Sequence, residues 1–242
     1  MPKELDECKL VGGRTAAEVL RIGDTVRRPI GPHSDFSHAL LKLLKEKTFN
    51  GAPRFLGIDE KGREVLTFIK GKVPHGEIDW TDDQLIVVVR MLKRFHDATA
   101  GSVLAGNQEV VCHNDVAPWN IVLDDTIPVA FIDFDGAEPG SRVDDLAYFL
   151  WTFLRLGSDI PADQQARKTR LLCETYGFSD GQALYDALIK QQNKILAERE
   201  MLAQEAPDKD SREFSASQAK NIRSEIEWVQ SHKTLFESIF RA

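Results

Sequence analysis

The segment from residue 110 to residue 135 constrains this chain more than any other, because polar residues stand at fixed positions beside short apolar runs. Its sequence is VVCHNDVAPWNIVLDDTIPVAFIDFD. The runs at 120–123 and 129–132 flank a turn with two aspartates and a proline, which predicts a β-hairpin. The hairpin would bring together the polar residues near its two ends, which are His113, Asp115, Asn120, Asp133 and Asp135.

These residue types suit the transfer of a phosphoryl group. That reaction needs a carboxylate beside the acceptor hydroxyl, to orient it and take its proton, and oxygen ligands for the Mg²⁺ that bridges a triphosphate. Asp115 suits the first task, and Asn120 and Asp133 suit the second. Asp135 is a further candidate metal ligand, with capping of the loop as the alternative. His113 completes the catalytic group, and we expect it to hydrogen-bond the loop backbone rather than to touch substrate.

The segments at 113–120 and 132–135, HNDVAPWN and IDFD, resemble the two signature motifs of the aminoglycoside phosphotransferase and choline kinase superfamily. The resemblance implies an α+β, protein-kinase-like fold with a small, mainly antiparallel β lobe and a larger helical lobe. It also implies ATP or GTP as phosphoryl donor, Mg²⁺, and a small-molecule acceptor with a hydroxyl group. An aminoglycoside-type antibiotic and an amino-alcohol metabolite are both possible acceptors.

The same resemblance divides the chain into two lobes. Residues 1–70 would form the nucleotide-binding lobe, and residues 71–242 the catalytic and acceptor-binding lobe, with a hinge at about 67–74. The adenine would then meet backbone groups of Thr67 and Ile69.

Candidate phosphate-binding residues lie near the N-terminus. Gly12 and Gly13 let backbone N–H groups approach phosphates closely, although the pair also fits an ordinary tight turn. Arg28 stands where the kinase pattern places a phosphate-binding lysine, with a solvated arginine on an edge strand as the alternative. The following helix should carry a glutamate that faces this basic residue. It offers His38 there, and its first glutamate is Glu46 at the far end, so we expect the ion pair to be missing or rebuilt.

Hydrophobic periodicity and capping signals predict the remaining elements. Strands are expected within residues 10–29 and at 55–58 and 64–69, and a turn-rich segment at 136–140. Helices are expected at 34–47, 81–97, 143–154, 162–176, 180–204 and 218–240.

Composition excludes several classes of protein. The chain has 242 residues and a net charge of −7, which gives no basic footprint for nucleic acid or for an anionic membrane. No apolar run reaches the length that spans a bilayer. Its three cysteines lack CxxC spacing, so we expect reduced thiols and a cytoplasmic location. Oligomeric state stays open.

Two alternative functions also stay open. The first is a catalytically silent, kinase-like module that binds nucleotide, indicated by the departures at Arg28 and His38. The second is a metal-dependent phosphoesterase with His113, Asp115 and Asp133 as ligands. The other histidines show no HxxxH spacing that would favour it.

Overall fold

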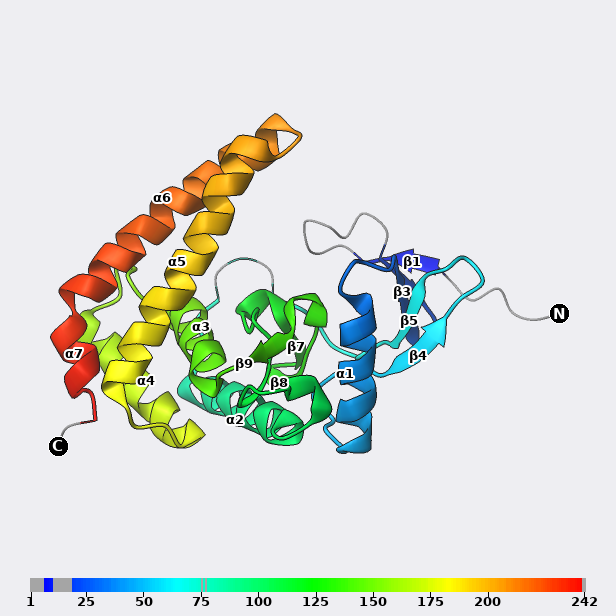
Figure 1. The fold of residues 1–242 in the computed structure, drawn as a ribbon, viewed down its shortest axis with the longest axis horizontal. Coiled ribbons are helices and arrows are strands. Elements are labelled where there is room, and N and C mark those ends of the chain that lie inside the picture. The colour runs from blue at the N-terminus through cyan, green and yellow to red at the C-terminus, as the bar shows by residue number, and fades with distance from the viewer. Residues whose placement is uncertain (1–6, 11–18, 75, 77, 241–242) are drawn as a thin grey trace. The chain divides into compact units, whose positions relative to one another are not determined.

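The computed structural model describes residues 7–10, 19–74, 76 and 78–240. The chain forms two compact units, residues 1–142 and residues 143–242 (Figure 1). The lobe boundary near residue 70, expected from the sequence, stays a prediction. Among the described residues, we find no helix with the length and apolar character needed to cross a membrane.

The first unit contains a five-stranded antiparallel sheet with the order β1-β2-β3-β5-β4. Its strands are β1 (Glu7–Lys9), β2 (Leu20–Ile22), β3 (Thr25–Arg28), β4 (Phe55–Ile58) and β5 (Glu64–Thr67). β2 and β3 form a hairpin whose turn contains Gly23 at φ 59°, a conformation that glycine adopts without strain. β3 then pairs with β5, which places Arg28 directly opposite Glu64.

Helix α1 (Ser34–Glu46) packs against β4 beside this sheet (Figure 1). Leu40, Leu41 and Leu44 are buried, so the helix turns an apolar face inward as its periodicity predicts. The buried hydroxyl of Ser37 donates a hydrogen bond of 3.0 Å to the backbone oxygen of Phe134. This bond ties the helix to the segment that carries the predicted metal ligands.

The long helix α2 (Asp82–Thr99) begins with the capping box that the sequence predicts. The Thr81 side chain accepts a hydrogen bond from the Gln84 amide, and the Gln84 side chain accepts one from the Thr81 amide. A short 3₁₀ turn (Val103–Ala105) follows, and the chain then enters the motif segment.

The motif segment forms two small antiparallel pairs. β7 (Ile121–Asp124) pairs with β8 (Ile127–Phe131), which confirms the predicted hairpin. β6 (Val110–Cys112) pairs with β9 (Glu138–Gly140). The sequence predicted a turn-rich segment at residues 136–140 and did not predict strand β9 there, because β6 supplies a partner for this proline- and glycine-containing stretch that local propensity does not reveal.

The second unit is helical: α3 (Arg142–Leu154, whose first residue closes the first unit), α4 (Ala162–Tyr176), α5 (Gly181–Glu205), α6 (Lys209–Ser231) and α7 (Lys233–Ser238). α5 and α6 lie side by side as a long antiparallel hairpin (Figure 1). The prediction of one helix over 218–240 was wrong at both ends. Asp208 caps α6 by accepting a hydrogen bond from the Ser211 amide, so the helix begins earlier. It ends at Ser231, and His232 separates it from α7.

Candidate phosphotransfer site

His113 lies beneath the loop that carries Asp115, where it is fully buried. Its Nε2 lies 3.1 Å from the backbone oxygen of Ile132, and its Nδ1 accepts a hydrogen bond of 3.3 Å from the Asp115 amide. With Nδ1 as the acceptor from the amide, Nε2 is the nitrogen that donates to the Ile132 oxygen. The ring also packs against Phe134, with ring centroids 4.6 Å apart. His113 therefore shapes the loop and joins it to the end of β8.

Asp115 and Asn120 are held together by side-chain hydrogen bonds. The Asn120 amide nitrogen donates to Oδ2 of Asp115 at 2.7 Å and to the Asp115 backbone oxygen at 3.0 Å. The indole nitrogen of Trp119 lies 3.4 Å from the same Oδ2, although half of the Trp119 side chain is exposed. Because its nitrogen serves Asp115, Asn120 can offer its oxygen to a cation.

Asp133 and Asp135 follow β8 and are half exposed, at 47% and 51% of their side-chain surface. The Ile132 amide donates to the Asn120 backbone oxygen at 3.0 Å. This bond places Asn120 beside the end of β8, directly before Asp133. Asp133 has φ 65° and ψ 68°, the left-handed region that costs most residues about 1–2 kcal/mol. Aspartate is among the few side chains that tolerate this conformation.

Arg28 reaches both of these aspartates from the end of β3. Its Nη1 lies 3.2 Å from Asp133 Oδ1 and 3.2 Å from Asp135 Oδ2, and its Nη2 donates to the other Asp135 oxygen. Burial alone would lower the pKa of this guanidinium, but the carboxylates of Asp135, Glu64 and Asp133 outweigh that effect and raise it. A permanent cation therefore faces the two acidic side chains.

Glu64 is the residue of this cluster that sequence reasoning missed. Its side chain is 1% exposed. One oxygen accepts a hydrogen bond from Arg28 Nε, and the other lies 2.8 Å from Nε2 of His38. His38 in turn stacks on Phe55 with ring centroids 3.8 Å apart. The expected ion pair is thus rebuilt with a carboxylate from β5. The signal that could have predicted it is the antiparallel pairing of β3 with β5, two four-residue strands, which sets Glu64 opposite Arg28.

The predicted nucleotide contacts are only partly visible. Gly12 and Gly13 lie outside the described residues. The Thr67 amide already donates to the Arg54 backbone oxygen at 2.9 Å, so it is engaged within the sheet. Ile69, two residues further along the chain, lies beyond the end of β5. The roles of Thr67 and Ile69 stay predictions.

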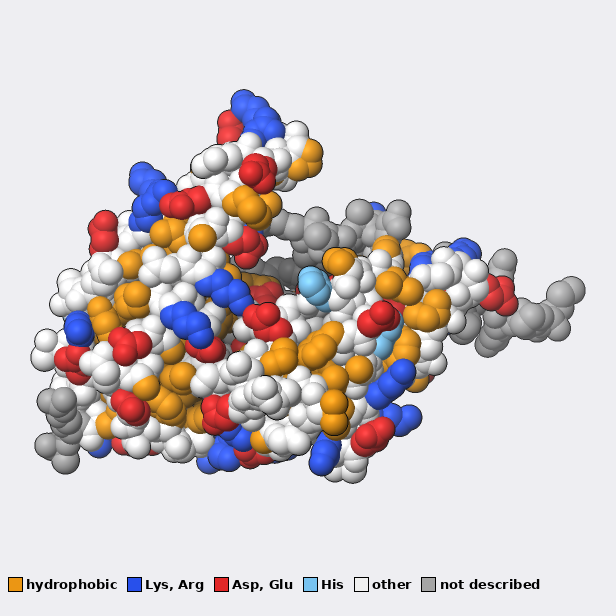
Figure 2. Space-filling model, in the orientation of Figure 1, with side chains coloured by type: hydrophobic (Ala, Val, Ile, Leu, Met, Phe, Trp, Pro, Cys, Tyr) orange, Lys and Arg blue, Asp and Glu red, His pale blue; other side chains and the backbone are white. Residues whose placement is uncertain are grey.

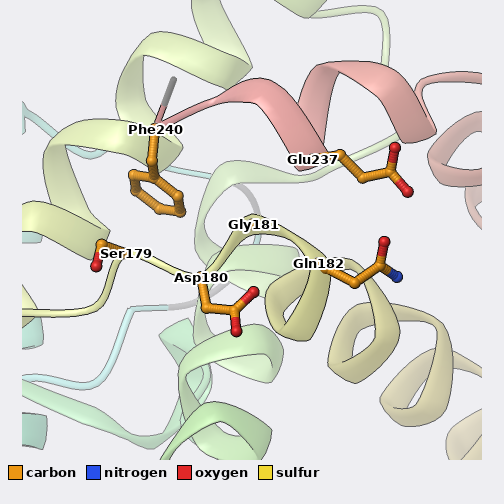
Figure 3. Close-up of a pocket in the computed structure, with 6 residues that line it drawn as sticks. All are labelled: Ser179, Asp180, Gly181, Gln182, Glu237 and Phe240. Carbon is orange, nitrogen blue, oxygen red and sulfur yellow. The ribbon is translucent and has the colours of Figure 1, made fainter. Parts of the chain in front are cut away.

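A pocket of about 420 Å³ lies in the second unit at the start of α5 (Figure 3). It is lined by Ser179, Asp180, Gly181, Gln182, Glu237 and Phe240. The Asp180 side chain caps α5 by accepting a hydrogen bond of 3.0 Å from the Ala183 amide. A Cβ on Gly181 would lie 2.4 Å from the Phe236 backbone oxygen, so the glycine permits α5 to approach α7. Helix capping and helix packing account for Asp180 and Gly181, and we assign no ligand to the pocket.

The charge distribution gives little guidance about the acceptor. On the face shown in Figure 2, acidic and basic side chains are interspersed among the described residues, without a broad patch of one sign. The sequence from residue 157 onward is likewise nearly balanced in charge. These observations do not favour a surface specialised for a polycation.

The fold is kinase-like: it combines a five-stranded sheet packed by α1, a loop with the HxDxxxxN motif, and a helical unit. Solved structures agree: a choline/ethanolamine kinase family protein from Mesorhizobium loti has a TM-score of 0.64 at 15% identity, covering 96% of this chain and 92% of its own. The ternary complex of APH(2″)-IIa with streptomycin and ATP has a TM-score of 0.60 at 12% identity, covering 93% and 94%.

Sequence comparison assigns the family. The profile of the phosphotransferase enzyme family matches residues 72–182. The trifolitoxin immunity protein of Rhizobium leguminosarum bv. trifolii is 33% identical over 257 aligned residues, which cover 96% of this chain and 97% of the relative. This chain belongs to the phosphotransferase enzyme family. The membership supports activity as a small-molecule phosphotransferase.

Proposed function

We propose that this protein transfers the γ-phosphoryl group of ATP or GTP, with Mg²⁺, to a hydroxyl group of a small molecule. One observation carries the proposal: Asn120 donates through its nitrogen to Asp115, which leaves its oxygen to serve a cation beside Asp133. A single loop then supplies both the group that receives the acceptor's proton and a ligand for the metal.

The donor set fits Mg²⁺. Asn120, Asp133 and Asp135 offer only oxygen ligands, and the two aspartates are half exposed. Hard divalent cations prefer such ligands. When bound, Mg²⁺ would neutralise charge on the phosphates of the nucleotide.

The protein's own residues would do the rest by positioning and charge. Asp115, its carboxylate oriented by Asn120, would align the acceptor hydroxyl and take its proton. Arg28 would bind phosphate oxygens through its two Nη groups, since guanidinium binds phosphate bidentately. His113 would keep the loop in place from below.

The test is calorimetric binding of ATP and of GTP, with and without Mg²⁺. We expect tight binding that requires Mg²⁺ and is lost in Asp133→Asn. Asparagine is the appropriate replacement because it tolerates the left-handed conformation at φ 65°, so only the charge is removed. Asp163→Asn, at an exposed position on α4, is the matched control and should bind like the wild type. Failure of the wild type to bind either nucleotide would refute the proposal.

The geometry argues against the phosphoesterase alternative. Both ring nitrogens of His113 are engaged by backbone groups, and the side chain is fully buried, so it is unsuited to ligate a catalytic metal. The silent-module alternative is distinguished by turnover. Release of ADP or GDP that depends on an acceptor, and that Asp115→Asn abolishes, would exclude it.

A second proposal concerns the biological role: protection of a cell against a toxin. It rests on the 33% identity to the trifolitoxin immunity protein along almost the whole chain. In this proposal the acceptor is a toxin or antibiotic that carries a hydroxyl group, and phosphorylation inactivates it.

Expression in a trifolitoxin-sensitive strain tests this role. We expect growth at toxin concentrations that stop the control strain, and loss of that growth with Asp115→Asn. Protection that survives the substitution would indicate immunity by binding alone. No protection by the wild-type chain would refute the role without touching the proposed chemistry.

A further inference from the structure

We propose that Glu64 is the positioning residue for phosphate binding, because it anchors the Arg28 guanidinium by its rear edge while the front edge faces the nucleotide site. The inference rests on the proposed function and adds a residue to it. It also assigns to His38 the task of holding Glu64.

The anchoring contact uses one side of the guanidinium only. Nε donates to Glu64, whereas Nη1 and Nη2 point to Asp133 and Asp135. A phosphate oxygen could therefore take the place of an aspartate at the Nη groups without breaking the bond at Nε. A guanidinium presents its donors in a rigid fork, so fixing one edge also fixes the direction of the other.

The burial of Glu64 supports a positioning role. A carboxylate that is 1% exposed is costly unless both oxygens are hydrogen-bonded. Here Arg28 satisfies one oxygen and His38, at 2.8 Å, lies at the other. His38 is itself 8% exposed and is held by stacking on Phe55. Phe55 thus holds His38, His38 holds Glu64, and Glu64 holds Arg28.

The backbone reinforces this arrangement. Arg28 and Glu64 are partners in the β3–β5 register, so their Cα atoms face each other across two hydrogen-bonded strands. Directly opposed residues of opposite charge are a stabilising cross-strand pair. Arginine would otherwise lose considerable side-chain freedom when it binds phosphate, and the anchor removes that loss in advance.

A purely structural Glu64 would only fasten α1 to the sheet through His38. A double-mutant cycle separates the two roles, because it isolates the coupling between two residues. The variants are Glu64→Gln, Arg28→Ala and the two combined, and the probe is calorimetric binding of ATP with Mg²⁺. Circular dichroism and melting temperature report whether each variant is folded.

We expect Glu64→Gln to weaken binding about tenfold, which corresponds to about 1.4 kcal/mol. In the Arg28→Ala background the same change should alter binding by less than twofold, since there is no guanidinium left to position. If Glu64→Gln does not fold, His38→Phe replaces it in the cycle. Phenylalanine retains the ring that stacks on Phe55 but removes the group that bonds Glu64, and we expect a smaller loss, about threefold, with the same dependence on Arg28.

Equal losses in both backgrounds would overturn the inference in favour of a structural role. Unchanged binding by a folded Glu64→Gln would overturn it as well. In both cases the wild type binds Mg²⁺ and ATP, so the proposed function survives. A wild type that binds no nucleotide overturns the proposed function and this inference together.

Discussion

Gly71 allows the segment after β5 to approach β7, and Gly71→Ala should strongly destabilise the first unit. A Cβ at this position would lie 2.4 Å from the Leu123 backbone oxygen and 2.6 Å from a methyl carbon of Val122. The adjacent Lys72 exchanges two backbone hydrogen bonds of 2.8 Å with Leu123, so the strands cannot separate without losing them. Gly71 also has φ 145°, which side chains rarely adopt.

The magnitude follows from these two causes. The backbone conformation costs a residue with a Cβ about 1–3 kcal/mol. Overlap with a packed backbone adds about 1–3 kcal/mol. We therefore expect the free energy of unfolding to fall by roughly 3 kcal/mol. At about 2–4 °C per kcal/mol for a chain of this size, the melting temperature should fall by about 6–12 °C.

Gly57→Ala is the matched control. Gly57 has a similar φ of 132°, but a Cβ there would meet no atom within 4 Å, so only the backbone cost applies. Thermal unfolding followed by circular dichroism should show a loss of only the backbone cost, about 1–3 kcal/mol and smaller than the loss for Gly71→Ala. Equal losses for Gly57→Ala and Gly71→Ala would refute the claim that the close approach to β7 dominates.

Three further changes test other parts of the structure. Thr81→Ala removes the capping box of α2 and should lower the free energy of unfolding by about 1 kcal/mol in urea titrations. The pKa of Glu225 lies above its ordinary value of 4.5, because burial raises it more than the hydrogen bond from the Trp151 indole lowers it. The folded state then binds the proton more tightly than the unfolded state, so this group's contribution to stability falls as pH rises above about 4.5. Glu225→Gln should therefore raise the melting temperature at pH 7 and have little effect on it at pH 4. The exposed control Glu227→Gln should leave the melting temperature unchanged at both pH values. An equal rise in melting temperature at pH 4 and pH 7 for Glu225→Gln would contradict this reasoning. Trp119→Phe keeps an aromatic ring but removes the N–H group near Asp115, so we expect an unchanged melting temperature and a several-fold lower kcat. An unchanged kcat would exclude a role for Trp119 in orienting the Asp115 carboxylate.

The sequence predicted best those features that depend on neighbouring residues. The hairpin of β7 and β8 follows from two apolar runs and a turn, and the capping box at Thr81 follows from a glutamine three residues on. The support given by His113 to the loop was also foreseen, because the motif places it two residues before Asp115. Each of these needs contacts within about twenty residues of the chain.

The features that escaped prediction depend on pairings between distant segments. Glu64 meets Arg28 only because β3 and β5 are neighbours in the sheet, whereas the kinase pattern predicts the carboxylate on the following helix. β9 forms because β6 is available as its partner, although local composition favours a turn. Strand pairing is set by tertiary context, which single-sequence patterns record poorly.

The Arg28–Glu64 pair also bears on how this protein could be controlled. In protein kinases the basic residue on the third strand is completed by a glutamate on a helix, so movement of that helix assembles or dismantles the site. Here the carboxylate comes from the adjoining strand, and backbone hydrogen bonds keep the two strands in register. Displacement of α1 would remove the His38 contact but leave the ion pair whole. We therefore expect the Arg28–Glu64 pair to be formed at all times. The rate of phosphoryl transfer would then be set by the amount of protein and the supply of substrate, rather than by movement of a helix.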